Sequence, residues 1–114
     1  MNDESILNTI KKLIGIREED ASYDVDLIVY INSAFMSLYQ LGVGPDKPYS
    51  IQSNDSTWDE FVGETENIQG VINYIYLKTK MIFDPPTGSS SSIYQEAIKE
   101  LEWRLNSAIE YEDS

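Results

Sequence analysis

Acidic residues are the side chains best able to do chemistry in this sequence. Carboxylates lie close together in the chain at Glu18-Glu19, Asp24 with Asp26, Asp59-Glu60, and Glu100 with Glu102. Such pairs can serve as the acid and base of glycoside hydrolysis, or can bind Mg²⁺ or Ca²⁺. None has the spacing of an EF-hand loop, and with 20 acidic residues in 114, close pairs arise by chance. We therefore predict neither a carboxylate active site nor a metal site.

The residue types that most catalytic sites need are missing. The chain has no Cys and no His, which excludes disulfides, thiolate or imidazole metal ligands, and nucleophile-His triads. Gly42 and Gly44 lack a third glycine and lead into Pro45, so they do not match a phosphate-binding loop. The sequence predicts a protein that is not an enzyme, with no catalytic residues and no cofactor.

Composition predicts one packed, acidic domain. The chain has 8 Lys+Arg against 20 Asp+Glu, a net charge of -12, with 41% hydrophobic and 11% aromatic residues. This hydrophobic content favours a packed core over disorder, and the length suits a single domain spanning residues 1–114. The negative charge disfavours tight binding of DNA or RNA through their phosphates.

The N-terminal segment shows no targeting signal. Residues 1–4 (MNDE) lack the basic start and apolar run of a signal peptide. No stretch approaches the roughly 18 apolar residues of a membrane span. We expect the protein to be made and kept in the cytosol, away from membranes.

Apolar residues recur with helical spacing in four segments. The first covers residues 3–14, and the second is capped by Ser22 or Asp24 and runs to Leu41. The third covers residues 66–83, and the fourth runs from about Ser92 to Glu110. Between the second and third, a Gly- and Pro-rich loop contains the capping-box spacing Thr57-x-x-Glu60, which predicts a short helical turn carrying Trp58. The expected fold is all-α: a small helical bundle of four main helices plus a short helical turn in a long loop.

Helical spacing also assigns faces. In the first segment it places Leu13 on the apolar side, with Asp3 and Glu4 at the start and Gly15 at the end. In segment 66–83 it assigns to the core Ile68, Val71, Ile72, Ile75, Tyr76, Ile82 and Phe83, and to the opposite side Tyr74, Leu77 and Met81. The Gly- and Ser-rich residues 88–92 are expected to form a flexible hinge before the last helix.

Trp103 is predicted on the polar face of its helix, where a large aromatic side chain is not expected in a monomer. On a helix its neighbours are polar or charged, namely Glu96, Lys99, Glu100, Ser107 and Glu110. Either its ring covers the stems of Lys99 and Glu100 or contacts the long loop, or it contacts another subunit, since Trp is enriched at interfaces. Val29, Met36, Leu77 and Met81 point to an interface in the same way, although each can instead face a neighbouring helix. Trp58 is the sixth interface candidate.

Four segments of the chain resemble a known family. They are residues 24–45 (DVDLIVYINSAFMSLYQLGVGP), 58–61 (WDEF), 74–86 (YIYLKTKMIFDPP) and 100–106 (ELEWRLN). In the same order, these look like the small head-tail connector, or adaptor, proteins encoded beside the capsid genes of siphophages of Gram-positive bacteria. No motif is specific by itself, and the resemblance covers nearly the whole chain.

The resemblance implies a structural role in the virion. It implies a compact helical bundle in a closed ring of about twelve copies beneath the portal protein. The ring would be assembled in the host cytoplasm, would extend the DNA channel at the head-tail junction without binding DNA specifically, and would dock a tail-side connector or stopper protein. The alternative is an acidic DNA mimic that inhibits a host DNA-binding enzyme. Such a mimic should array its carboxylates on one face, whereas here they are spread over every segment.

Overall fold

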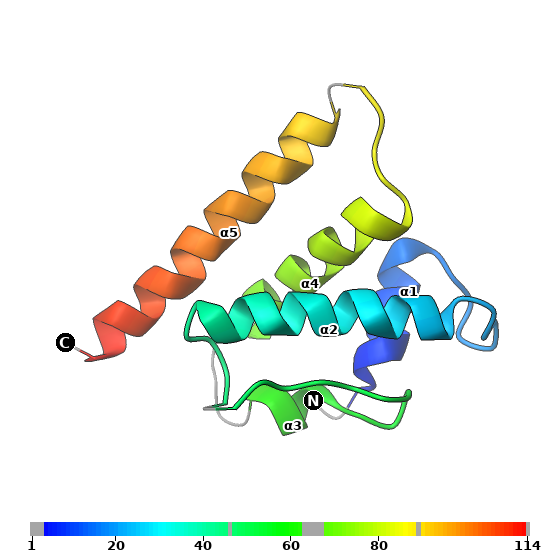
Figure 1. Cartoon of the computed structure of the whole chain (residues 1–114), viewed down its shortest axis with the longest axis horizontal. Helices are drawn as coiled ribbons and strands as arrows, with labels where there is room; N and C mark the ends of the chain where they lie inside the picture. The colour runs from blue at the N-terminus through cyan, green and yellow to red at the C-terminus, as the bar shows by residue number, and fades with distance from the viewer. Residues whose placement is uncertain (1–3, 46, 63–67, 89, 114) are drawn as a thin grey trace.

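Five helices make up the regular structure of the part of the chain that is described. The structure is a computed structural model and describes residues 4–45, 47–62, 68–88 and 90–113. The helices are α1 (Ile6–Ile14), α2 (Asp24–Gln40), α3 (Trp58–Val62), α4 (Ile68–Phe83) and α5 (Ser90–Asp113) (Figure 1). Within those ranges the only β pairing is an isolated bridge between Ser5 and Thr57. The predicted all-α fold, with four main helices and a short helix in the long loop, is confirmed.

Helix α4 is the centre of the bundle. It packs against α1, α2 and α5, and Figure 1 shows α2 crossing in front of it while α5 runs alongside. The buried core draws on all five helices and the long loop: Ile6, Leu7, Ile10, Leu27, Ile31, Ala34, Phe35, Leu38, Val43, Ile51, Trp58, Phe61, Val71, Tyr74, Ile75 and Leu105.

The central position of α4 corrects its predicted faces. Tyr74 was expected on the side away from the core but is fully buried, whereas Ile82 was expected in the core but is half exposed. A single apolar stripe was assumed, yet partners on several sides bury more than one face of this helix.

Hydrogen bonds to Asn32 and packing of aromatic rings hold the long loop against α2. The side chain of Asn32 in α2 donates to the carbonyl of Ile51 (3.0 Å) and accepts from its N–H (2.7 Å). The rings of Phe35, Tyr49 and Phe61 pack together, with centroids 4.7 to 5.4 Å apart. The loop is therefore ordered by α2 rather than by strand pairing.

Trp58 joins α3 to α1. Its Nε1 donates to Thr9 Oγ1 at 3.0 Å, and its backbone N–H donates to the carbonyl of Glu4 at 3.2 Å. The side chain is only 2% exposed. Trp58 is a core residue, which corrects its expected place at an interface: the capping turn points this ring inward, because α1 lies directly against it.

The helix starts differ from those predicted. Ser5 caps α1 by accepting from the N–H of Asn8 at 3.2 Å, and Gly15, with φ +98°, ends it as expected. Tyr23 occupies the cap position of α2 and makes no side-chain cap bond. Asp24 and Ser22 are therefore not the cap of α2.

The predicted hinge overlaps α5. Ser90, Ser91 and Ser92 belong to the first turn of this helix, and Gly88 precedes it with φ +63°. Ser89 lies outside the described residues. Three residues of the predicted hinge are therefore helical, and flexibility before the last helix stays a prediction.

Candidate interaction surface

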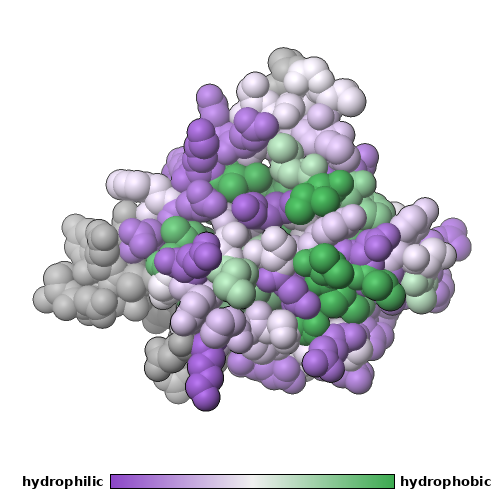
Figure 2. Space-filling view, viewed as in Figure 1, coloured by the Kyte–Doolittle hydropathy of each residue, from purple (hydrophilic) through white to green (hydrophobic). Residues whose placement is uncertain are grey.

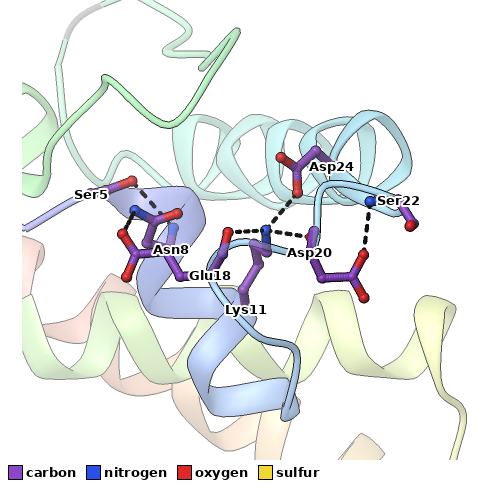
Figure 3. A network of polar contacts seen from close by, with 7 residues as sticks. All are labelled: Ser5, Asn8, Lys11, Glu18, Asp20, Ser22 and Asp24. Atoms are coloured by element: carbon purple, nitrogen blue, oxygen red, sulfur yellow. Dashed lines mark hydrogen bonds and ion pairs between the residues drawn. The ribbon is translucent and has the colours of Figure 1, made fainter.

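A buried lysine lies at the middle of the best-connected polar cluster (Figure 3). Lys11 is 1% exposed. Its Nζ donates to the carbonyls of Glu18 (3.0 Å) and Asp20 (2.7 Å) and lies 2.9 Å from Asp24 Oδ1. Two of the three donors of the ammonium group thus have carbonyl acceptors, and the carboxylate of Asp24 adds an ion pair. The cluster ties the connection between α1 and α2 to both helices.

Its outer members make separate contacts. Asn8 donates to Glu18 Oε1 at 3.0 Å, and the N–H of Ser22 donates to Asp20 Oδ1 at 3.0 Å. The hydrogen bonds from Ser22 hold the pKa of Asp20 below its ordinary value.

Members of the carboxylate pairs named from the sequence contact other side chains in the structure. Asp24 contacts Lys11, Glu60 accepts from the hydroxyl of Tyr49, Glu100 pairs with Arg104, and Glu102 accepts from Tyr74. Among the described residues, no group of three or more carboxylates is placed to hold a metal ion.

The first exposed apolar surface, which we call the α2 stripe, comprises Val25, Val29 and Met36. Their side chains are 76%, 59% and 45% exposed. At 100° per residue they lie within about 40° of one another and span about 16 Å of the helix. Figure 2 shows apolar side chains gathered over the first half of α2, bordered by hydrophilic ones. Val29 and Met36, two of the predicted contact residues, thus share one face.

Trp103 lies on the outer face of α5, with its side chain 70% exposed. Glu96, Lys99 and Glu100 are also exposed on this helix, whereas Leu105 is buried against the core. The ring is therefore not covered by the long loop or by its neighbours' stems. Its role in a contact stays a prediction.

A groove lies between α4 and α5. Its lining is Lys78, Met81, Ile82, Gln95, Ile98, Lys99 and Glu102. Below it, the hydroxyl of Tyr74 donates to Glu102 Oε2 at 2.7 Å and connects the two helices. Burial and the adjacent Glu102 carboxylate raise the pKa of Tyr74 well above its ordinary value, so the phenol remains a donor. Met81 lines the groove, and Leu77 is half-buried on the same helix.

A second hollow, between α1 and the segment after it, has a mixed lining of polar and apolar atoms. It comprises Glu4, Ser5, Asn8, Thr9, Lys12, Gly15, Ile16, Arg17, Glu18 and Glu19. Two cations and three acids share this lining with apolar atoms, so it shows no concentration of one kind of charge that would select a ligand.

Sequence reasoning missed Lys11 and the groove. Lys11 sits at one edge of the apolar stripe of α1 and Leu13 at the other, so either could have faced the core. The structure buries Lys11 and leaves Leu13 exposed, because the carbonyls of the following segment cover the lysine side. The groove arises from two helices far apart in sequence and has no sequence signal.

A family model described as "Phage connector protein" matches residues 6–112. The match starts at the first residue of α1 and ends one residue before the end of α5. It confirms the resemblance to connector proteins, while an origin in siphophages of Gram-positive bacteria stays a prediction. Searches of curated proteins and of solved structures gave no match.

Proposed function

This chain belongs to the phage connector protein family, and we propose that it is the head-tail connector subunit that forms a ring beneath the portal protein. The ring would extend the DNA channel and offer a docking surface to a tail-side connector or stopper protein. The family match over residues 6–112 carries this proposal, since connector proteins are structural components of the phage particle.

The exposed surfaces support assembly. A closed ring needs two different contact surfaces on each subunit. The α2 stripe, the outer face of α5 with Trp103, and the groove between α4 and α5 give the chain several apolar surfaces that the monomer leaves open. A ring contact between neighbouring subunits uses two of these three surfaces. The remaining surface is then available for the portal or for a tail-side protein.

The charge supports passage of DNA. A net charge of -12 disfavours the phosphate contacts that cause tight, sequence-independent DNA binding. A channel lined by such a chain would let DNA move past it without being retained. Within the part of the chain that is described, no helix is both long and apolar enough to cross a membrane.

Removal of this chain from its phage tests the proposed role. A phage in which the coding sequence is interrupted by a stop codon should fill its cells with separate heads and tails, visible by electron microscopy. Supplying the chain from a plasmid should restore joined particles. Normal tailed particles without the chain would contradict a connector role.

A further inference from the structure

The few cations of this chain limit how two copies can touch. Two chains that each carry a net charge of -12 repel one another, so a contact between copies must bring Lys or Arg against carboxylates. Among the described residues, internal ion pairs occupy Lys11, Lys80 and Arg104. The cations in these pairs are already neutralised within their own chain.

The groove between α4 and α5 carries two other cations. Lys78 and Lys99 line it together with the apolar side chains of Met81, Ile82 and Ile98. Its one acidic residue, Glu102, accepts a hydrogen bond from Tyr74 inside the chain. The groove therefore combines an apolar floor with a local excess of positive charge, in a molecule that is strongly negative as a whole.

The outer face of α5 offers an aromatic ring and an acid instead. Trp103 is exposed there beside Glu96, while Glu100 is already paired with Arg104. An amphipathic helix laid into a groove is a common mode of recognition, and a Trp anchor is typical of the residues that dominate such contacts. The α2 stripe offers no equivalent, because α2 contains no Lys or Arg.

We propose that the groove between α4 and α5 receives the outer face of α5 from a second copy of this chain. Trp103 of one copy contacts Met81 and Ile82 of the next, and Glu96 faces Lys78. This inference rests on the proposed ring and names the contact that joins its subunits. Because groove and outer face are different surfaces, each bound copy leaves one of each open, so the contact repeats until the ring closes.

Charge reversal tests this contact. Lys78→Glu places acid against acid, and Glu96→Lys places base against base, so each variant alone should lose the ring-sized species that wild type forms, alone or on the portal protein. An equimolar mixture of the two should recover it, because every groove then meets an outer face of opposite charge in an alternating ring. The double variant Lys78→Glu/Glu96→Lys should also recover it.

Matched controls separate a specific contact from net charge. Lys12→Glu and Glu19→Lys make the same changes in net charge at exposed residues outside the groove, and both should assemble like wild type. Circular dichroism should show all variants equally helical. Single variants that assemble like wild type, or a folded mixture that does not recover, would overturn the inference while leaving the connector role intact.

Disulfide trapping gives a second measurement. The chain has no Cys, so a mixture of Ile82→Cys and Glu100→Cys should crosslink two copies on oxidation. In the control mixture of Val25→Cys and Glu100→Cys, where Val25 lies outside the proposed contact, this crosslinking should be lost. Equal crosslinking in both mixtures would exclude the proposed contact. If wild type assembles neither alone nor on the portal, the proposed function fails together with this inference.

Discussion

Lys11 is the residue whose environment most determines local structure. The carbonyls of Glu18 and Asp20 accept hydrogen bonds from its Nζ and the carboxylate of Asp24 forms an ion pair with it, and burial of a charge is tolerated only where such partners exist. Two of the acceptors are backbone carbonyls, so the connection between α1 and α2 is held by its main chain. The side chains of Glu18 and Asp20 accept hydrogen bonds from Asn8 and from the N–H of Ser22 instead.

Replacing Lys11 by Met tests this role. The Met side chain keeps the apolar stem but leaves the Asp24 carboxylate without its cation and two backbone carbonyls without their donor, so the unfolding free energy should fall by roughly 3 kcal/mol. Urea unfolding measures the change. The exposed neighbour Lys12 provides the control, since Lys12→Met should alter stability by less than about 0.5 kcal/mol. Equal effects of the two substitutions would show that the cluster contributes nothing.

Asp20 gives a pH dependence of known sign. Its pKa is lower in the folded chain than its ordinary value of 3.8, chiefly because Ser22 hydrogen bonds to the carboxylate. A lowered pKa means that the folded state favours the ionised form, so the stabilisation is present above the unfolded pKa and is lost as pH falls through the folded pKa. Wild type should therefore be more stable than Asp20→Asn at pH 7, with the difference shrinking below pH 3.8. A difference that grew on acidification would contradict the assignment.

At the scale of elements, periodicity predicted the helices but not all of their faces. Residues 68–83 and 24–40 are helical as the apolar spacing indicated. Tyr74 was assigned to the wrong side and the burial of Lys11 was missed, because helical spacing cannot say how many neighbours a helix will have. The exposure of Trp103 followed from spacing alone, since its helix packs chiefly through one face. The groove depends on how α4 and α5 meet, which only tertiary structure reveals.

Gly44 shows how an element depends on one backbone position. Its φ is +96°, and a Cβ at this position would lie 2.5 Å from Cζ of Phe61. That ring is buried between Phe35 and Tyr49 and has little room to move. The glycine is thus required by the turn and by close packing, not by phosphate binding.

Two glycine substitutions separate these effects. Gly44→Ala should lower unfolding free energy by roughly 2 to 4 kcal/mol through strain and overpacking. Gly15 has a similar φ of +98°, but nothing lies within 4 Å of the new Cβ. Gly15→Ala should therefore lower the unfolding free energy by only about 1 to 2 kcal/mol. Thermal or urea unfolding of both variants measures the difference. A Gly44 variant no worse than the Gly15 variant would show that Phe61 gives way freely.

For the whole molecule, the connector role explains features that the monomer does not. The α2 stripe, Trp103 and the groove remain open to solvent in a chain that otherwise buries a complete core. A net charge of -12 disfavours contact with DNA, and with other copies unless opposite charges are matched. Membership of the connector family could be recognised from sequence, because the resembling segments keep their order along the chain, whereas the position of the contacts could not.

The mass of the assembled protein tests the central claim most directly. Light scattering should be measured on the purified chain alone and mixed with the portal protein of the same phage, at concentrations well above micromolar. The connector role predicts a ring-sized species in at least one sample. A strict monomer that ignores the portal would contradict the proposed function and would favour the acidic inhibitor of a DNA-binding enzyme instead.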